Sequence, residues 1–314
     1  MDLSVVVPVY RSKDLLPELY RRLNRTLPKI TSSYEMLFVD DGSRDGSWEV
    51  LQRIARTDRH VRAFKLSKNF GQHAATLCGI RQSGGKYIVT LDDDLEHPPE
   101  AIPQLLQKAR QGWDLVYGVF PQRTHPGWRN LTSEVARFLF RLAIPKLNDT
   151  YSSFRVIQRE PAQALDRFES PFPFVDGYLS WVTNNCATVE VPHGQRGNGS
   201  SHYTFRKLLR HTINIFVTFS DLPLRLATWL GLVVLLLGFF WVVFILVGHW
   251  TGYITMSGYS SLMAGITVFS GTQLMMLGVF GEYIGRINFT TSRKPLYLIS
   301  QREEPRHPSS RKYP

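Results

Sequence analysis

The sequence predicts an α/β fold with a mainly parallel β-sheet, followed by two C-terminal helices that cross a membrane. Short apolar runs alternate with stretches of helical period over the first 125 residues, a pattern typical of sheets whose strands are joined by helices. Nearer the carboxyl end, two segments of at least 20 residues contain no charged side chain, and about 20 apolar residues are enough to cross a bilayer. The 314 residues have room for about two domains of roughly 100–200 residues each.

The first part of the chain alternates between expected strands and expected helices. Five short apolar runs are expected to form strands: Leu3–Val9, Glu35–Val39, Val61–Leu66, Lys86–Leu91 and Asp114–Val119. Four amphipathic stretches are expected to form the intervening helices: Asp14–Leu27, Ser47–Ala55, Gln72–Gln82 and Pro98–Arg110. Strands that are apolar throughout are typical of a parallel sheet with both faces covered. Such sheets bind ligands beyond the carboxyl ends of their strands, so the residues that follow each run are the candidate site.

Two long uncharged segments predict the membrane part. Leu226–Val247 and Leu262–Gly281 contain 22 and 20 residues without a charge, and at about 1.5 Å per residue each can cross a hydrocarbon core of roughly 30 Å. The spans are expected at 226–247 and 262–284, although polar side chains in the second also fit a buried core helix. The 14 residues between the segments contain no Lys or Arg, whereas basic residues flank the pair outside. The positive-inside rule therefore predicts a multi-pass protein of the inner (plasma) membrane with both termini, and so the α/β part of the chain, in the cytoplasm.

The net charge has a membrane explanation. Lys and Arg number 37 against 26 Asp and Glu, a formal net charge of +11, which suits nucleic acid, anionic lipid or a phosphorylated substrate. Leu131–Leu142 and Thr204–Phe219 are basic and amphipathic, as are helices that lie on a membrane surface; core helices with a basic edge are the alternative. Because both stretches combine basic side chains with an apolar face, membrane lipid is the expected partner and nucleic acid is not. Two cysteines, Cys78 and Cys186, are too few for a disulfide scaffold and are expected to be reduced thiols.

These patterns give the expected domain organisation. It comprises a cytoplasmic catalytic domain at 1–203 that includes an interface helix near 131–142, an amphipathic interface helix at 204–222, two transmembrane helices within 223–287, and a cytoplasmic tail at 288–314.

Carboxylates follow two of the expected strands. Asp40-Asp41-Gly42-Ser43 comes after the second run and Asp92-Asp93-Asp94-Leu95-Glu96 after the fourth. Two acidic clusters at one sheet edge repel each other unless a cation or hydrogen-bond donors compensate. Asp92 and Asp94 are alternate residues that can reach one ion, and their hard oxygen atoms suit Mg²⁺ or Mn²⁺, which in turn bridges a diphosphate. A helix-capping turn and a solvated loop are the structural alternatives.

Four motifs resemble those of family 2 glycosyltransferases of the GT-A fold: VVVPVY at 5–10, FVDDGSRDGS at 38–47, LSKNFGQHAATLCGI at 66–80 and TLDDDLEHPPEAIP at 90–103. More narrowly, the chain resembles the polyprenyl-phosphate glycosyltransferases, which include dolichol-phosphate mannose synthase and bacterial undecaprenyl-phosphate sugar transferases. The resemblance extends over about residues 3–300 and includes both apolar segments.

The resemblance implies a role for particular residues. It places on the metal Asp92, Asp94 and Glu96, the last where relatives often carry Gln. It places on the nucleotide Pro8, Tyr10, Asp40, Asp41, Lys68, Asp92 and Asp93. It places on the acceptor phosphate Arg155, Arg196, Ser201 and His202. It assigns catalysis to Asp94, Asp149 and Arg196. Arg196 begins a glycine-containing loop that resembles the family's RxxGxSKY motif, for which a solvated hairpin is the alternative.

The sequence departs from the family pattern at two further places. Arg11 and Ser12 follow Tyr10, where relatives usually read PVYNE, so an acid on the nucleotide side is missing. His202 stands where the family carries Lys, and an imidazole is only partly charged near neutral pH.

The expected function is inverting transfer of one sugar from a nucleotide sugar, with UDP the expected nucleotide, to polyprenyl (undecaprenyl) phosphate at the cytoplasmic membrane face. The product would serve cell-envelope glycan or lipid modification, and the resemblance implies a homo-oligomer, namely a tetramer. A phosphate monoester carries about −1.5 to −2 charges near neutral pH, so the acceptor needs alignment and charge cancellation more than a general base. The alternatives are a processive polysaccharide synthase, which needs more spans and a QxxRW motif absent here, and a non-catalytic flippase or scaffold, for which two spans offer no charged path.

Overall fold

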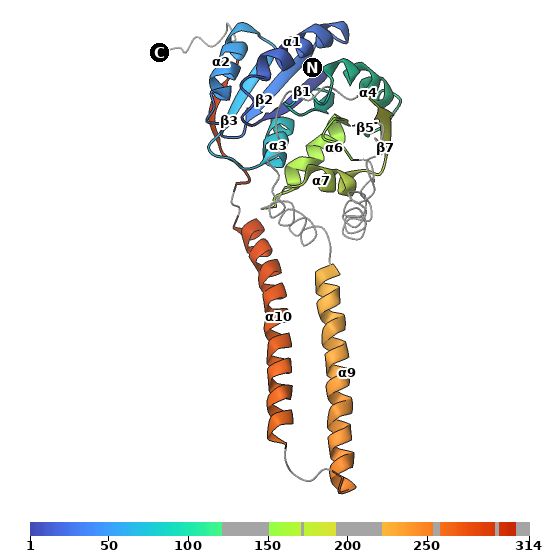
Figure 1. Ribbon diagram of the computed structural model, residues 1–314. Coiled ribbons are helices and arrows are strands. Elements are labelled where there is room, and N and C mark those ends of the chain that lie inside the picture. The colour runs from blue at the N-terminus through green and yellow to red at the C-terminus, as the bar shows by residue number, and fades with distance from the viewer. Residues whose placement is uncertain (121–150, 171–172, 193–221, 254–257, 293–294, 306–314) are drawn as a thin grey trace. The chain divides into compact units, whose positions relative to one another are not determined.

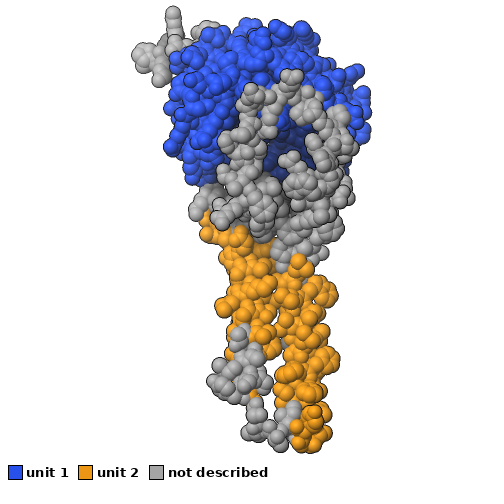
Figure 2. Space-filling view, in the orientation of Figure 1, with its two compact units in different colours: residues 1–207, 295–314 blue, residues 208–294 orange. Residues whose placement is uncertain are grey.

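The computed structural model describes residues 1–120, 151–170, 173–192, 222–253, 258–292 and 295–305. The chain divides into two compact units, the first formed by 1–207 with 295–314 and the second by 208–294 (Figure 2). The interface helix expected near 131–142 lies outside the described residues, and so does the one expected at 204–222 except for its last residue, Leu222. Four of the site residues expected from the sequence also lie outside them: Asp149, Arg196, Ser201 and His202.

The first unit is built on an eight-stranded sheet of order β7-β5-β6-β4-β1-β2-β3-β8. Its four parallel central strands are β4 (Tyr87–Thr90), β1 (Leu3–Val9), β2 (Tyr34–Asp40) and β3 (Val61–Leu66). All seven side chains of β1 and of β2 are buried, because both faces of these strands are covered, as their continuous apolar sequences predict. The expected strands all form, each end within one residue of its predicted position.

The outer strands make the sheet mixed. β6 (Arg155–Gln158) runs antiparallel to both of its neighbours, β4 and β5 (Leu115–Val119). β7 (Cys186–Glu190) lies parallel to β5, and β8 (Ile299–Glu303) lies antiparallel to β3 at the other edge. The expectation of a mainly parallel sheet therefore holds for its centre, where the candidate site lies.

Helices cover both faces of this sheet (Figure 1). One face carries α1 (Leu16–Thr26), α2 (Ser47–Thr57) and, behind a 3₁₀ turn at Pro99–Ala101, α4 (Ile102–Ala109). The other face carries α3 (Gln72–Gln82), α6 (Arg159–Ala164) and α7 (Val175–Val182). Each large apolar side chain buried between these layers contributes about 1.5–3 kcal/mol relative to exposure. All four predicted helices form.

The described residues of the second unit form two long helices, α9 (Leu222–Trp250) and α10 (Tyr259–Thr291). Within the described residues, one segment is long and apolar enough to cross a membrane, Leu226–Ile245 of α9, and of its described side chains only Ala227 is buried. That segment matches the first predicted span. The second, at 262–284, lies in α10 and is not among the candidate spans found in the described residues, so it stays a prediction.

The chain beyond α10 returns to the first unit. The sequence predicts a tail from 288 onward, whereas α10 continues to Thr291 and 299–303 form the edge strand β8. The indole N–H of Trp48 donates to the side-chain oxygen Oε1 of Gln301 at 2.7 Å, and Arg56 pairs with Glu303 at 3.2 Å. This strand covers the edge of β3, which would otherwise present unpaired backbone groups. Cys78 and Cys186 are free thiols, as expected.

Candidate active site

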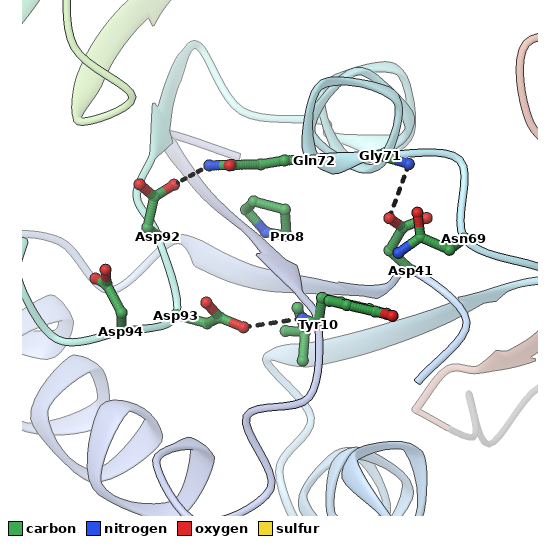
Figure 3. Close-up of a pocket in the computed structure, with 10 residues that line it drawn as sticks. Pro8, Tyr10, Asp41, Asn69, Gly71, Gln72, Asp92, Asp93 and Asp94 are labelled. Atoms are coloured by element: carbon green, nitrogen blue, oxygen red, sulfur yellow. Dashed lines mark hydrogen bonds between the residues drawn. The ribbon is translucent and has the colours of Figure 1, made fainter. Parts of the chain in front are cut away.

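The candidate site is a pocket of about 280 Å³ at the carboxyl edge of the parallel strands (Figure 3). Its walls come from the end of β1, from the segments that follow β1, β2, β3 and β4, and from the first residue of α3. The lining residues are Pro8, Val9, Tyr10, Asp41, Asn69, Gly71, Gln72, Asp92, Asp93 and Asp94. Five of the residues assigned to the nucleotide by sequence resemblance are therefore brought together: Pro8, Tyr10, Asp41, Asp92 and Asp93. Asn69, Gly71 and Gln72, which the sequence reasoning did not assign individually, complete the wall.

The two aspartates after β2 have different environments. The Asp41 carboxylate lines the pocket and accepts hydrogen bonds from the backbone N–H groups of Phe70 and Gly71, at 2.7 and 2.9 Å. Burial raises its pKa to about 6 against the opposing effect of these two donors. Asp40 is fully buried and does not line the pocket, and its Oδ1 accepts from the Ser43 backbone N–H at 3.2 Å. The predicted nucleotide contact of Asp40 is therefore not supported: this carboxyl lies beneath the turn.

The turn after β2 packs tightly against the loop after β3. Gly42 has φ +70°, and a Cβ there would lie 2.6 Å from the Lys68 carbonyl carbon. Only glycine meets both conditions without strain. This close approach brings Asp41 next to the backbone donors of the β3–α3 loop.

Asp93 joins the ends of β4 and β1. Its Oδ2 accepts from the Tyr10 backbone N–H at 2.9 Å and from the Ser12 hydroxyl. Burial raises the pKa of Asp93 to about 6. Ser12, which stands where relatives carry an acid, thus serves as a donor to this carboxylate. The same loop contains Arg11 at φ +56°, a sparsely populated conformation for a non-glycine residue.

Asp92 and Asp94 are suited to a divalent cation. Both line the pocket, and Mg²⁺ is commonly held by one or two carboxylates together with substrate phosphates and water. Glu96 does not line the pocket, and its backbone N–H donates to Asp94 Oδ1 at 3.0 Å. In the described part of the chain, no three Asp, Glu, His or Cys side chains are close enough to form a metal cage. Two carboxylates of the kind that bind Mg²⁺ therefore line one pocket, and the predicted third ligand Glu96 does not line it with them.

A second, basic pocket of about 230 Å³ adjoins the first. It is lined by Tyr10, Arg11, Gly42, Arg44, Ser67, Lys68 and Asn69, so it shares Tyr10 and Asn69 with the carboxylate pocket. Lys68, expected at the nucleotide, lies here, with its ammonium 5.1 Å from the centre of the Phe70 ring. The sequence predicts Lys68 at the nucleotide, whereas the structure places it in the adjoining pocket and not in the wall of the carboxylate pocket.

Arg155 is not positioned as the sequence predicts. It is 1% exposed on β6 and pairs with Asp176 of α7, which is 3% exposed. Its Nε donates to the Thr90 hydroxyl at 3.0 Å. A guanidinium committed to buried partners is not available to a lipid phosphate, which corrects the predicted acceptor contact. Asp176 has no signal in the sequence motifs, because its partner is 21 positions away on another element.

Fold and site together are those of a glycosyltransferase domain, with a sheet of central parallel strands and a carboxylate-lined pocket at their ends. Residues 4–165 match the model of glycosyl transferase family 2. The chain belongs to this family. Residues 222–287 match the GtrB C-terminal hairpin.

The chain is similar over nearly its full length to several bacterial glycosyltransferases. It is 34% identical to the uncharacterized glycosyltransferase YkcC of Bacillus subtilis, over 95% of this chain and 93% of the relative. It is also 34% identical to undecaprenyl-phosphate 4-deoxy-4-formamido-L-arabinose transferase of Pseudomonas aeruginosa, over 95% of this chain and 89% of the relative.

Solved structures share the fold. The mannosyl-3-phosphoglycerate synthase of Rubrobacter xylanophilus superposes with a TM-score of 0.51 at 17% identity, over 69% of this chain and 73% of that one. At this identity the likeness concerns the fold alone, and it agrees with the predicted GT-A architecture.

Proposed function

We propose that this family 2 glycosyltransferase transfers a single sugar from a nucleotide sugar to polyprenyl phosphate, with inversion at the anomeric carbon. The observation that carries the proposal is the convergence of Asp41, Asp92, Asp93 and Asp94 on one pocket at the carboxyl edge of the sheet. The name of the Pseudomonas aeruginosa relative, an undecaprenyl-phosphate sugar transferase, supports undecaprenyl phosphate as the acceptor class.

The donor nucleotide, with UDP the expected one, would occupy the carboxylate pocket. Tyr10 is 43% exposed at its rim, where its ring can cover a nucleobase. The Asp41 carboxylate is held by two backbone donors, so it is oriented before the ligand arrives and can accept from the nucleoside. Lys68 and Arg11, in the adjoining basic pocket, add positive charge near the bound anion.

The diphosphate end would lie against Asp92 and Asp94. A divalent Mg²⁺ or Mn²⁺ ion, when bound, would neutralise the diphosphate and stabilise it as a leaving group. The two carboxylates would hold the ion at the end of β4. Gln72 Nε2 orients the Asp92 carboxylate, to which it donates at 2.6 Å. Metal dependence thus belongs to the proposal.

The acceptor phosphate is expected to be aligned by Arg196, Ser201 and His202, with Asp149 near the reacting centre. A planar guanidinium binds phosphate through two parallel hydrogen bonds. Because the acceptor is already anionic, one in-line attack on the anomeric carbon suffices, and the acids act as orienting groups rather than as a glycosidase pair.

The proposed location is the cytoplasmic face of the inner membrane, with 226–247 and 262–284 as spans. The exposed apolar segment Leu226–Ile245 and the match to the GtrB C-terminal hairpin support an anchored enzyme. Assembly into a homo-oligomer, a tetramer by family resemblance, belongs to the same proposal.

The test is to incubate the purified full-length chain with undecaprenyl phosphate, Mg²⁺ and a panel of nucleotide sugars, and to identify the lipid product by mass spectrometry. The proposal predicts one lipid-linked sugar from a preferred donor. Asp94→Asn, at a pocket-lining residue, serves as the matched inactive control. If the folded enzyme forms no sugar lipid from any donor, or adds several sugars in succession, the proposal is wrong.

A further inference from the structure

Both carboxylate oxygens of Asp92 accept hydrogen bonds from side chains on other segments. Gln72 Nε2 donates to Oδ1 at 2.6 Å (Figure 3). The Ser153 hydroxyl donates to Oδ2, also at 2.6 Å. The Asp92 backbone N–H in turn donates to His97 Nδ1 at 3.3 Å. Asp92 is thus held in one orientation by partners that are not themselves acidic.

The Ser153 backbone is held from the neighbouring strand. Its carbonyl accepts from the Thr90 hydroxyl at 2.6 Å. Thr90, the last residue of β4, is 1% exposed. The Thr90 oxygen also accepts from Arg155 Nε at 3.0 Å. These hydrogen bonds form a continuous path from the Arg155 guanidinium through Thr90 and Ser153 to the Asp92 carboxylate.

The far end of the chain of bonds is the buried pair of Arg155 and Asp176. Tyr117, 2% exposed, donates its hydroxyl to the same Asp176 oxygen at 3.2 Å. A buried ion pair rarely adds net stability, because the cost of removing two charges from water offsets their attraction. A role in orienting other groups is therefore a better physical reason for it than stabilisation.

We propose that Thr90, Ser153 and the Arg155–Asp176 pair are positioning residues that pre-orient Asp92 for a divalent cation. The pair fixes Thr90, Thr90 fixes the Ser153 carbonyl, and the Ser153 hydroxyl holds Asp92 Oδ2. Partners behind a metal ligand commonly change metal affinity by about 10–100-fold when they are removed. The inference rests on the proposed function, since it concerns the same cation.

The test measures Mn²⁺ affinity by electron paramagnetic resonance, on the full-length protein with UDP present. Ser153→Ala removes the final donor and is expected to weaken Mn²⁺ binding about tenfold. Ser153→Thr keeps a hydroxyl and should restore most of the affinity. In the transfer assay, Ser153→Ala should raise the Mn²⁺ concentration needed for half-maximal rate, and saturating Mn²⁺ should recover most of kcat.

Ser152→Ala is the matched control. This neighbouring hydroxyl accepts only the Phe154 backbone N–H, at 3.1 Å, among the contacts of the described chain, so Mn²⁺ affinity should stay at the wild-type value. Thr90→Val breaks the middle of the path, and combining it with Ser153→Ala should weaken binding no further than the single variants do, because residues on one path are not additive. Asp176→Asn is avoided as the main test because an uncompensated Arg155 would endanger folding.

The outcomes separate the two proposals. If wild type forms the sugar lipid but Ser153→Ala binds Mn²⁺ as tightly as wild type, the positioning role is wrong and the proposed function stands. If Ser153→Ala weakens Mn²⁺ binding while wild type forms no sugar lipid, the positioning role stands and the proposed function is wrong. Additive losses in the double variant would also overturn the path through Thr90.

Discussion

The backbone N–H of Tyr10 donates to the Asp93 carboxylate at 2.9 Å across 83 positions of sequence. This bond joins the loop after β1, which carries the aromatic rim of the pocket, to the acidic segment after β4. The nucleoside and diphosphate ends of the proposed donor site are therefore built as one piece. A substitution that breaks this bond in either loop is therefore expected to shift the residues of the other loop.

Asp94→Asn is expected to abolish turnover and leave the protein folded. The substitution preserves shape but removes a negative charge from the pair proposed to hold the cation, and its loop position carries little of the core. Sugar-lipid formation and circular dichroism on the same preparation measure the two effects. A metal chelator should abolish sugar-lipid formation by the wild-type enzyme, and added Mg²⁺ or Mn²⁺ should restore it. A variant with near-normal activity and unchanged metal dependence would show that the cation binds elsewhere.

Arg196→Ala is expected to lower turnover at least tenfold, which corresponds to about 1.4 kcal/mol of transition-state stabilisation. The reason is the loss of paired donors to phosphate, which a lysine ammonium reproduces only in part. Arg196→Lys should therefore recover part of the rate. Nucleotide-sugar binding without lipid, measured by calorimetry, should stay largely intact. Normal turnover of the alanine variant, or a defect confined to nucleotide affinity, would remove Arg196 from the acceptor site.

The segment between the two proposed spans is expected to lie outside the cell. A Ser257→Cys variant should therefore react with a membrane-impermeant thiol reagent applied to intact cells. The same reagent on wild type is the control for the two native cysteines. Labelling that requires permeabilised cells would contradict the two-span topology.

Asp41 is expected to make stability fall as pH rises from about 4 to about 6. Burial raises its pKa from 3.8 to about 6, so between these values the folded state holds a proton that the unfolded state has lost. The contribution lost is about 2–3 kcal/mol. Thermal unfolding at pH 4.5 and 6.5 should show a smaller fall for Asp41→Asn than for wild type.

Asp14→Asn, at an exposed carboxyl on the same unit, is the control for that comparison and should behave as wild type. Equal pH dependence in Asp41→Asn and wild type would show that the buried Asp41 carboxyl does not titrate in this range.

The sequence identified much of the site through short motifs that directly follow the expected strands. Motifs after β1, β2 and β4 give Tyr10, Asp41, Asp92 and Asp94, because strand ends of a parallel sheet meet at one edge. The sequence did not predict the roles of Ser12, Ser153 and Asp176. Each acts through a partner that is distant in sequence, and neither residue type nor spacing reports such a contact.

By itself, the sequence determined the alternation of strands and helices, the carboxylate edge and the apolar segment of α9, since each follows from periodicity or composition within a short window. Only the tertiary structure decided that Asp40 lies beneath its turn, that Arg155 is paired with Asp176, and that 299–303 complete the sheet. The sequence Ile-Ser-Gln-Arg-Glu of β8 is mostly polar and lacks a strand's apolar pattern. Its pairing depends on the free edge of β3 and on the position of the Trp48 indole beside that edge. Both are established only once the sheet and α2 have formed.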